Sequence, residues 1–424
     1  MDKITLVNGW HDDNKGDSAI VIATMKLLQA KRDDIRFGLV SELDLGKDDI
    51  IHAYRHVLSA IGPISITPRI LTTFSPSSAF WRYPSALNYL RRFLVEASRT
   101  APSTHCSRQL IAQSDLVISK GGHMLHARKS NPIHWANLYS HLYPLVLSRK
   151  YMVPYAIWGH SLGPFADRLS LSLTSRVLAN AELVAVREKI SYDIALQMDV
   201  PRDKLRLIPD PAFAIEPHYS ERLKLALQGH GLLPNDFIAV TVRPWLSLPR
   251  QDFGHYLDGI AKMSRRLVDR GLASHIAVVV HAMGPNQNEN DLVASKMLME
   301  RLRDAPAILV DDDFSPEELC ALYGQSRFVI GTRFHSVILA LAAGTPAYAI
   351  SYFGPKAVGM MQDLGMGEWV TAINALHVDK TVEMVLRSDL NDKRDEIIQK
   401  VRQYRKKLRD ETNFLLALQR NGHS

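Results

Sequence analysis

The sequence predicts an α/β protein made of two Rossmann-like domains that face each other across a cleft. Three observations support this prediction. A chain of 424 residues is too long for one compact domain of ordinary size. Short apolar runs alternate with helix-like segments through both halves of the chain, as in parallel sheets whose strands are joined by helices. Charged residues directly follow many of these apolar runs, and in an open parallel sheet that strand end is where ligands bind.

The first predicted domain spans residues 1–215. It opens with a strand at 4–7, a polar loop and an apolar-periodic helix over 18–29. Residues 63–108 hold prolines and aromatics without clean periodicity, and we interpret them as a helical insertion. The remaining strands are expected at 37–40, 115–119, 154–158, 183–186 and 205–209.

The second predicted domain spans residues 220–385 and follows a polar, helical linker. Ser315 and Glu318 have the spacing of a capping box, which predicts a helix over 315–326. Residues 386–424 form a last helix dense in lysine and arginine, which can pack back on the first domain, face anionic lipid or simply be solvated. The strands are expected at 237–242, 276–280, 308–310, 328–330 and 347–352. Two such domains in succession are typical of a GT-B-like architecture.

Composition narrows the class of partner and the compartment. A formal charge of +7 and a pI near 9.2 favour an acidic ligand or surface. No basic stripe with interleaved aromatics is apparent, so we do not expect nucleic acid as a partner. The N-terminus has no apolar signal region, and no stretch approaches the ~20 apolar residues that span a bilayer. We expect a cytoplasmic protein whose membrane contact, if any, is peripheral and at the inner face.

The two cysteines, Cys106 and Cys320, lie in different predicted domains. A secreted chain of this length usually carries more cysteines, so both are expected to be reduced, buried thiols. The sequence contains no His/Cys/Asp cluster with metal-ligand spacing, and no metal is predicted.

The most informative stretch is Gly-Thr-Arg-Phe-His-Ser at 331–336, between an apolar run and a helix-like run. A strand that turns at a glycine directly into a helix aims unpaired N–H groups into the turn. Arg333 adds a bidentate cation and His335 adds a group that can exchange a proton near neutrality, with Ser336 beside them. The alternative is a surface arginine and a capping histidine. Lys356 follows the next predicted strand, at 347–352, and is therefore expected at the same sheet edge. A lysine at that edge favours an anion site.

Other polar motifs also follow predicted strands. Asn14 and Asp17 flank Gly16 in the first loop, where Asp17 is either a helix N-cap or a substrate contact. Gly121-Gly122, with His123 next to them, would let a ligand approach the backbone closely. The loop after the first strand, which contains Asn14 and Gly16, lacks the Gly-x-Gly-x-x-Gly fingerprint, so no nicotinamide cofactor is expected.

Four more candidates are found at the ends of later strands. His160 lies in Gly-His-Ser-x-Gly-Pro-Phe, which resembles a serine elbow but runs into a proline and has no triad partners. Arg187 follows the strand at 183–186 and is either an anion ligand or half of a surface Arg–Glu pair. Asp210 could handle protons or a sugar hydroxyl, or brace Arg187. Arg243 follows the first strand of the second domain.

Three stretches carry a resemblance to a known family: the motif at 331–336, Gly-Thr-Pro at 344–346 and Ser-Tyr…Lys…Gly-Met-Met-Gln-x-Leu-Gly at 351–365. Through them the chain resembles the polysaccharide pyruvyl transferase family, and in particular its bacterial exopolysaccharide, colanic acid type. The Asn14 loop, the His160 block, Arg187 and Asp210 match further family positions. The resemblance covers nearly the whole chain except about 45–110. The family carries an acidic residue after Gly121-Gly122. This chain has His123 and His126 near that position instead. The two histidines could take the place of the acidic residue, the acceptor could differ, or both could be exposed loop histidines.

This resemblance implies transfer of the pyruvyl group of phosphoenolpyruvate to two hydroxyls of a sugar, as a ketal, without a cofactor. The expected acceptor is a sugar or a lipid-linked oligosaccharide. His335 is the first candidate for proton transfer, unless it binds phosphate as imidazolium, and Asp210 is the second. The candidate substrate-binding residues are Arg333, Arg187, Lys356, Arg243, Asn14, Asp17, Gly121, Gly122, His123, His160 and Ser336. The alternatives are a GT-B glycosyltransferase that uses a nucleotide sugar and a non-catalytic, anion-binding relative.

Overall fold

The protein divides into two compact units in a computed structural model that describes residues 2–44, 47–71, 83–245, 250–352 and 356–418. Unit 1 comprises Met1–Trp10, Ile20–Asp210 and Lys407–Ser424, and unit 2 comprises His11–Ala19 and Pro211–Lys406. The chain therefore enters unit 2 early, for a single loop and the first turns of a helix.

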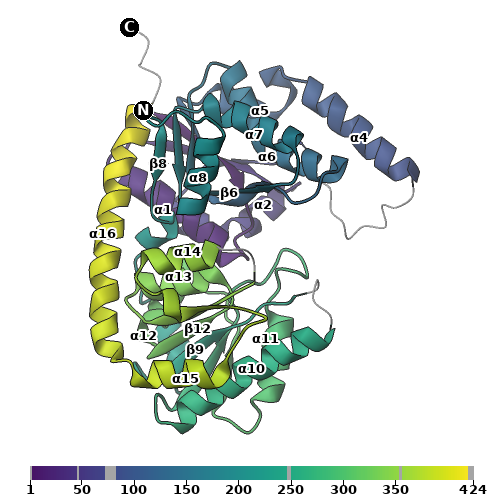
Figure 1. The fold of residues 1–424 in the computed structure, drawn as a ribbon. Helices are drawn as coiled ribbons and strands as arrows, with labels where there is room; N and C mark the ends of the chain where they lie inside the picture. The colour runs from purple at the N-terminus through teal and green to yellow at the C-terminus, as the bar shows by residue number, and fades with distance from the viewer. Residues whose placement is uncertain (1, 45–46, 72–82, 246–249, 353–355, 419–424) are drawn as a thin grey trace. The chain divides into compact units, whose positions relative to one another are not determined.

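Unit 1 is built on one parallel sheet with the strand order β3-β2-β1-β4-β6-β7-β8, and β5 pairs with β6 off this path (Figure 1). Its strands are β1 (Lys3–Gly9), β2 (Arg36–Ser41), β3 (Ser65–Thr67), β4 (Leu116–Ser119), β5 (Gly122–Ala127), β6 (Tyr155–Phe165), β7 (Leu183–Val186) and β8 (Leu205–Leu207). The helices of this part of the chain are α1 (Lys15–Gln29), α2 (Lys47–Ala53), α3 (Arg55–Ile61), α4 (Tyr83–Ser98), α5 (Cys106–Ala112), α6 (Pro132–Lys150), α7 (Arg168–Ala179) and α8 (Lys189–Gln197).

The central strands of unit 1 are apolar on both faces because helices cover both sides of a parallel sheet. All four residues of β4 and of β7 are buried. The sheet order reverses between β1 and β4, which makes this pair the topological switch point.

Unit 2 repeats this plan with a six-stranded parallel sheet in the order β11-β10-β9-β12-β13-β14. Its strands are β9 (Phe237–Thr241), β10 (His275–Val279), β11 (Ala307–Val310), β12 (Phe328–Gly331), β13 (Ala347–Ser351) and β14 (Val370–Ala372). Its helices are α9 (Glu221–Gly229), α10 (Arg250–Asp269), α11 (Leu292–Arg301), α12 (Pro316–Gln325), α13 (Phe334–Ala342), α14 (Lys356–Asp363), α15 (Val378–Arg387) and most of α16 (Leu390–Ala417). Helix α10 packs against α11 and α15, and α12 packs against α13 (Figure 1).

The predicted α/β class and the pair of Rossmann-like sheets are confirmed. The capping box is also present: the Ser315 hydroxyl accepts from the Glu318 N–H, and the Glu318 carboxylate accepts from the Ser315 N–H. Cys106 and Cys320 are both free; Cys320 is buried as predicted, whereas Cys106 is exposed, so its predicted burial is wrong. No helix among the described residues is both long enough and apolar enough to cross a bilayer.

Three further local predictions need correction. Helix α1 begins at Lys15 rather than Ser18, so Asp17 lies in its first turn and is not the N-cap. The segment 63–108 is not wholly helical, because Ser65–Thr67 adds a parallel edge strand beside β2. Strand β6 does not end at Trp158 but continues through the His160 motif.

The reason for the longer β6 is a partner that the sequence pattern did not reveal. The stretch after Gly121, expected as a loop, forms β5 and pairs with β6 in parallel, with Gly122 opposite His160 and Leu125 opposite Leu162. Beyond the end of β4, this second ladder satisfies the backbone groups of β6 that would otherwise be unpaired.

Candidate anion site of the second unit

The site in unit 2 lies at the carboxyl ends of β9 and β12, where the strand order of the sheet reverses. The Thr332 N–H donates to the Thr241 carbonyl at 3.1 Å, and the hydroxyls of Thr241 and Ser336 are 2.7 Å apart. Ser336 is fully buried and also donates to the Arg333 carbonyl at 2.6 Å. In this structure Ser336 therefore fixes the turn between β12 and α13.

Arg333 is held by a buried carboxylate, Asp291. Its Nε donates to Oδ1 at 3.0 Å and to Oδ2 at 3.1 Å, and its Nη2 donates to Oδ1 at 2.7 Å. Asp291 also accepts from the Ala282 N–H at 3.0 Å. Burial alone would lower the pKa of Arg333, but Asp291 raises it above its ordinary value, so the guanidinium stays charged. Burial raises the pKa of Asp291, and the charge of Arg333 opposes that shift.

This pair changes the role expected of Arg333. The bidentate edge formed by Nε and Nη2 faces Asp291, which leaves Nη1 outside the interaction. Asp291 was not among the sequence candidates, because it lies in a loop 42 residues before Arg333 with no motif around it. The contact follows from the order of the strands: β10 and β12 flank β9, so the loops after them meet.

Arg243 has a freer guanidinium than Arg333. It stacks 4.1 Å from the centre of the Tyr352 ring and 5.7 Å from that of Trp245. Its side chain also donates to the Pro244 carbonyl at 3.3 Å and the Asn288 carbonyl at 3.5 Å. Within the described residues no carboxylate lies within 4 Å of it, although the charge of Asp291 reaches it. Arg243 is therefore a cation without a direct ion-pair partner in the described part of the chain.

His335 is the second residue of α13 and packs against the N-terminal loop of the chain. A Cβ atom built on Gly16 would lie only 2.3 Å from its Nδ1 atom. Only glycine fits there without displacing the imidazole. The Asn14-x-Gly16-Asp17 motif and the Arg333–Ser336 motif, more than three hundred positions apart, thus belong to one site.

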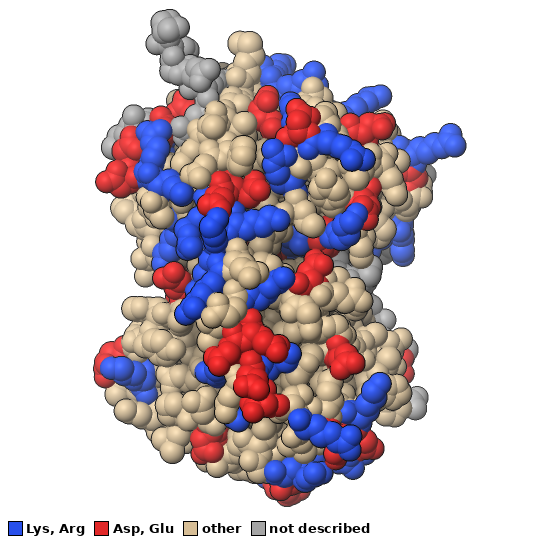
Figure 2. Space-filling model, turned by 60° about the vertical axis from the view of Figure 1, so that its left-hand side comes forward, with Lys and Arg blue, Asp and Glu red and all other residues tan. Residues whose placement is uncertain are grey.

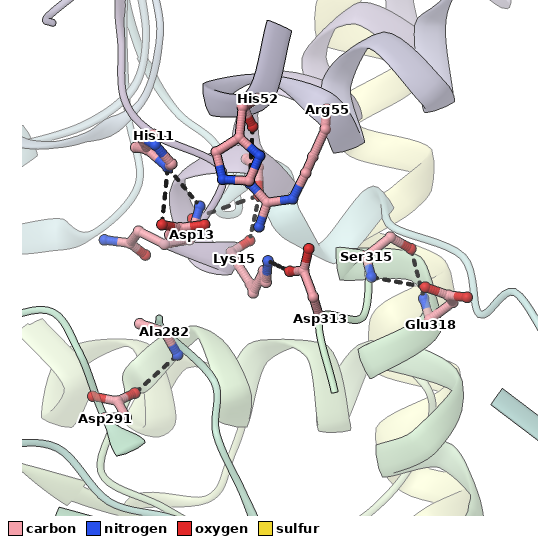
Figure 3. Close-up of polar contacts among 12 residues, drawn as sticks. His11, Asp13, Lys15, His52, Arg55, Ala282, Asp291, Asp313, Ser315 and Glu318 are labelled. Carbon is pink, nitrogen blue, oxygen red and sulfur yellow. Dashed lines mark hydrogen bonds and ion pairs between the residues drawn. The ribbon is translucent and has the colours of Figure 1, made fainter. Parts of the chain in front are cut away.

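The N-terminal loop is fixed to unit 2 by several contacts (Figure 3). Asn14 forms an antiparallel bridge with Ala282, and the Met283 N–H donates to the Asp13 carbonyl at 2.9 Å. Lys15 is almost fully buried and forms an ion pair with Asp313 at 2.5 Å (Figure 3). Lys15 and Asp313 are not among the predicted site residues, because nothing in the sequence brings them together.

Asn14 and Asp17 contribute through the first turn of α1. The Asn14 carbonyl accepts from the N–H groups of Asp17 at 3.0 Å and Ser18 at 3.2 Å. Their side chains are half-buried. This turn positions Gly16 against His335.

His281 lies at the end of β10 and is also missing from the sequence candidates. It is buried, and its Nδ1 is 3.0 Å from the Tyr323 hydroxyl. Burial, followed by the charge of Arg333, lowers its pKa well below the ordinary value, so His281 is neutral. Lys356 begins α14, but its side chain lies outside the described part of the structure.

Unit 1 contains a second polar cluster, around Arg187 and Asp210. Arg187 Nη1 contacts Asp210 Oδ2 at 2.5 Å, and its Nε donates to the Ser161 hydroxyl at 2.8 Å. Ser161 in turn donates to Glu188 at 2.8 Å. Arg187 is only 9% exposed, and Asp210 and Glu188 are fully buried, so a surface Arg–Glu pair is wrong. Asp210 braces Arg187, as one alternative predicted.

His160 lies inside this unit on β6 and is completely buried. Its Nε2 is 2.9 Å from the Ser119 hydroxyl, which accepts from the Asn8 side-chain amide at 3.0 Å. Burial and then the charges of Lys120 and Arg187 lower the pKa of His160 to about 3. The imidazole is therefore neutral at every physiological pH.

The double glycine of unit 1 has a packing role. A Cβ on Gly121 would lie 2.6 Å from the carbonyl oxygen of Gly159, so the close neighbour is the backbone of β6. His123 is half-buried in β5, with Nε2 2.6 Å from the Gly163 carbonyl, and its ring centre is 4.6 Å from that of His126. These two residues are not exposed loop histidines.

The sequence candidates thus divide between the two units. Unit 2 brings together Arg333, His335, Ser336, Arg243, Asn14 and Asp17. Unit 1 holds Arg187, Asp210, His160, Gly121, Gly122 and His123. In the described ranges, no three His, Cys, Asp or Glu side chains are grouped so as to hold a metal ion.

Comparisons with known proteins agree with this picture. The family model described as polysaccharide pyruvyl transferase matches residues 14–354. The amylovoran biosynthesis protein AmsJ of Erwinia amylovora is 23% identical over 399 residues, which cover 88% of this chain and 89% of AmsJ.

Solved structures resemble the chain in fold at low sequence identity. A UDP-N-acetylglucosamine 2-epimerase matches with a TM-score of 0.61 and 12% identity, covering 100% of this chain and 98% of the epimerase. Anabaena HepE in complex with UDP matches with a TM-score of 0.58 and 13% identity, covering 98% of this chain and 100% of HepE. A Rickettsia africae glycosyltransferase matches with a TM-score of 0.53 and 13% identity, covering 99% of each chain. The GT-B-like architecture is confirmed by these neighbours.

Proposed function

Because this chain belongs to the polysaccharide pyruvyl transferase family, we propose that it transfers the pyruvyl group of phosphoenolpyruvate to two hydroxyls of an exopolysaccharide sugar. The observation that carries the proposal is the convergence of Arg243, Arg333 and His335 at the switch point of unit 2. The similarity to an amylovoran biosynthesis protein supports an exopolysaccharide or its precursor as the acceptor.

The donor has a phosphate and a carboxylate, and the site offers complementary groups. Arg243 has no direct ion-pair partner among the described carboxylates, and its stacking on Tyr352 restrains the guanidinium in one plane. Arg333 is held rigidly by Asp291 with Nη1 outside the pair. The first N–H groups of α13 add a helix N-terminus, a favourable position for a phosphate. We assign donor binding to these groups, with Lys356 as a further candidate.

In the proposed reaction, His335 gives a proton to the methylene carbon of phosphoenolpyruvate while a sugar hydroxyl adds to the neighbouring carbon. The second hydroxyl then bonds to the same carbon as phosphate leaves. One hydroxyl proton replaces the proton that His335 gave up, and the other leaves with phosphate. The products are therefore a ketal and inorganic phosphate, and the reaction needs no cofactor.

Unit 1 is the proposed acceptor side. Asp210 is the second candidate for proton transfer, and Arg187 would orient it through their ion pair. His123 and His160 remain candidates for the acceptor environment. We propose a cytoplasmic reaction, at the inner face of the membrane if the acceptor is lipid-linked.

Thermal stabilisation tests the donor site, because a ligand that binds only the folded state raises the melting temperature. Phosphoenolpyruvate at a hundred times its Kd should stabilise the wild type by about 2.7 kcal/mol. Arg243→Gln should abolish the shift without unfolding the protein, since Arg243 has no buried carboxylate partner. Arg270→Gln, the same change at an exposed arginine of unit 2, should keep the shift.

Two outcomes would overturn the proposal. A shift with UDP-sugars but none with phosphoenolpyruvate would indicate a nucleotide-sugar glycosyltransferase. A shift with phosphoenolpyruvate that is never followed by acceptor-dependent phosphate release would indicate a non-catalytic relative. His335→Gln should retain the shift and lose phosphate release if His335 transfers the proton.

A further inference from the structure

Helix α4 is attached to unit 1 by one face of its C-terminal half. Phe93 is buried in the core of the unit and meets the edge of Tyr139, with ring centres 6.2 Å apart. The Tyr143 hydroxyl donates to the Ala97 carbonyl at 3.0 Å. Buried Arg108 donates to the Glu96 carbonyl at 2.8 Å, near the end of the helix. These contacts fix the rotation of the helix about its axis.

The opposite face of this half of α4 combines exposed apolar and basic side chains. Leu94 is 65% exposed and Val95 is 43% exposed. Arg91 and Arg92 are exposed one turn earlier. At 100° per residue, Arg91 and Val95 lie next to each other on the surface, with Leu94 and Arg92 on either side. We call these four residues the α4 face.

The α4 face is positively charged. The one acidic residue among its described neighbours on the helix, Glu96, forms an ion pair with Arg108 at 2.6 Å and with Arg99 at 3.5 Å. Arg91 and Arg92 have no carboxylate within 4 Å among the described residues. An apolar strip flanked by unneutralised arginines is the pattern of a helix that lies in the interface of an anionic bilayer.

We propose that the α4 face docks the protein on the surface of an anionic lipid bilayer. Leu94 and Val95 would enter the boundary between headgroups and acyl chains, and Arg91 and Arg92 would contact the lipid phosphates. A basic protein surface alone would attract anions, but it gives no reason for two large apolar side chains to be exposed beside the charges.

Helix α16, which the sequence indicated as a membrane candidate, fits this role less well. Arg394 and Arg405 donate to main-chain carbonyls inside unit 2. Its exposed cations include Lys406 and Lys407. Among its described residues, the exposed large apolar side chain is Phe414, whose ring lies against the Arg206 guanidinium at 5.3 Å. On the face drawn in Figure 2, groups of Lys and Arg alternate with groups of Asp and Glu.

The test is co-flotation of the full chain with vesicles of phosphatidylcholine and phosphatidylglycerol in a ratio of roughly 7:3. About one lipid in three of these vesicles is anionic. We expect flotation at low salt and none with pure phosphatidylcholine. Arg91→Gln with Arg92→Gln should lower the partition coefficient about 25-fold, since each basic residue near the surface contributes roughly a factor of five. Leu94→Ser with Val95→Ser should lower it about tenfold or more.

Lys406→Gln with Lys407→Gln is the matched control, because it removes the same charge from α16 and should float like the wild type. Flotation lost in this control but kept in the α4 variants would overturn the proposal. Loss of self-association in Leu94→Ser with Val95→Ser, with flotation unchanged, would assign the face to a second copy instead. Neither phosphoenolpyruvate nor an acceptor is present, so failure here is distinct from failure of the proposed transferase activity.

Discussion

At the scale of single residues, the site of unit 2 depends on a charge pair that has been removed from water. Arg333 and Asp291 are both buried, and their attraction has to offset the cost of desolvating two ions. The geometry is favourable, with three contacts between 2.7 and 3.1 Å. The pair holds a guanidinium in a fixed place next to His335, which a solvated arginine could not do.

Removing one partner of this pair should be costly. Asp291→Ala would leave Arg333 buried without its counter-ion, and we expect a loss of about 3–5 kcal/mol in the free energy of unfolding. Urea denaturation measures this directly. Asp258→Ala breaks an exposed pair with Arg301 in the same unit and should cost less than about 1 kcal/mol. Equal stability of the two variants would contradict the buried-pair interpretation.

At the scale of secondary-structure elements, the site is formed where the first turn of α1 meets the first turn of α13. Each helix begins a few residues after a strand ends, so the N-termini of both helices face the site. The bridge between Asn14 and Ala282 fixes the first of these turns to the loop after β10. The N-terminal loop therefore forms part of the proposed donor site in unit 2.

Gly16→Ala tests this meeting of elements. The new methyl group would lie 2.3 Å from His335 Nδ1, so either the loop or the imidazole must move. We expect acceptor-dependent phosphate release to fall at least 100-fold, on the order of the loss that a 1 Å misplacement causes. Gly229→Ala in α9 adds a methyl group with no atom within 4 Å and should leave activity unchanged. Full activity in Gly16→Ala would show that His335 does not act from this position.

At the scale of the whole molecule, a fully buried histidine lies at the sheet of each unit. His160 lies in unit 1 and His281 in unit 2, and burial lowers the pKa of both. In the unfolded chain a histidine titrates near its ordinary value of about 6.5. Between that pH and the lower folded pKa, the unfolded state binds protons that the folded state does not. Stability is therefore expected to fall as the pH drops from about 6.5 towards 3.

His160→Gln should make this acid sensitivity smaller. The contribution of one such histidine is at most about 1.4 kcal/mol per pH unit. Comparing melting temperatures at pH 7 and pH 5 should give a smaller difference for His160→Gln than for the wild type. His255→Gln, at an exposed position of α10, should behave as the wild type does. An unchanged difference in His160→Gln would mean that another group controls the acid response.

The fold was predictable because apolar runs and helical periodicity are local signals that survive without tertiary context. The capping box at Ser315 and the strand before Arg333 were correct for this reason. The extent of β6 was not predictable, since it depends on pairing with β5. Local pattern cannot tell a polar loop from a strand whose partner comes from elsewhere in the chain.

By itself, the sequence determined the alternation of strands and helices, the family motif at 331–336 and the types of residue available at the sheet edges. The tertiary structure alone decided which of these residues are neighbours. It placed Gly16 against His335 and paired Arg333 with Asp291. It left Arg243 without an ion-pair partner among the described carboxylates. The physical reason is that ion pairs and close packing depend on distance in space, and strand order brings together loops that are hundreds of residues apart.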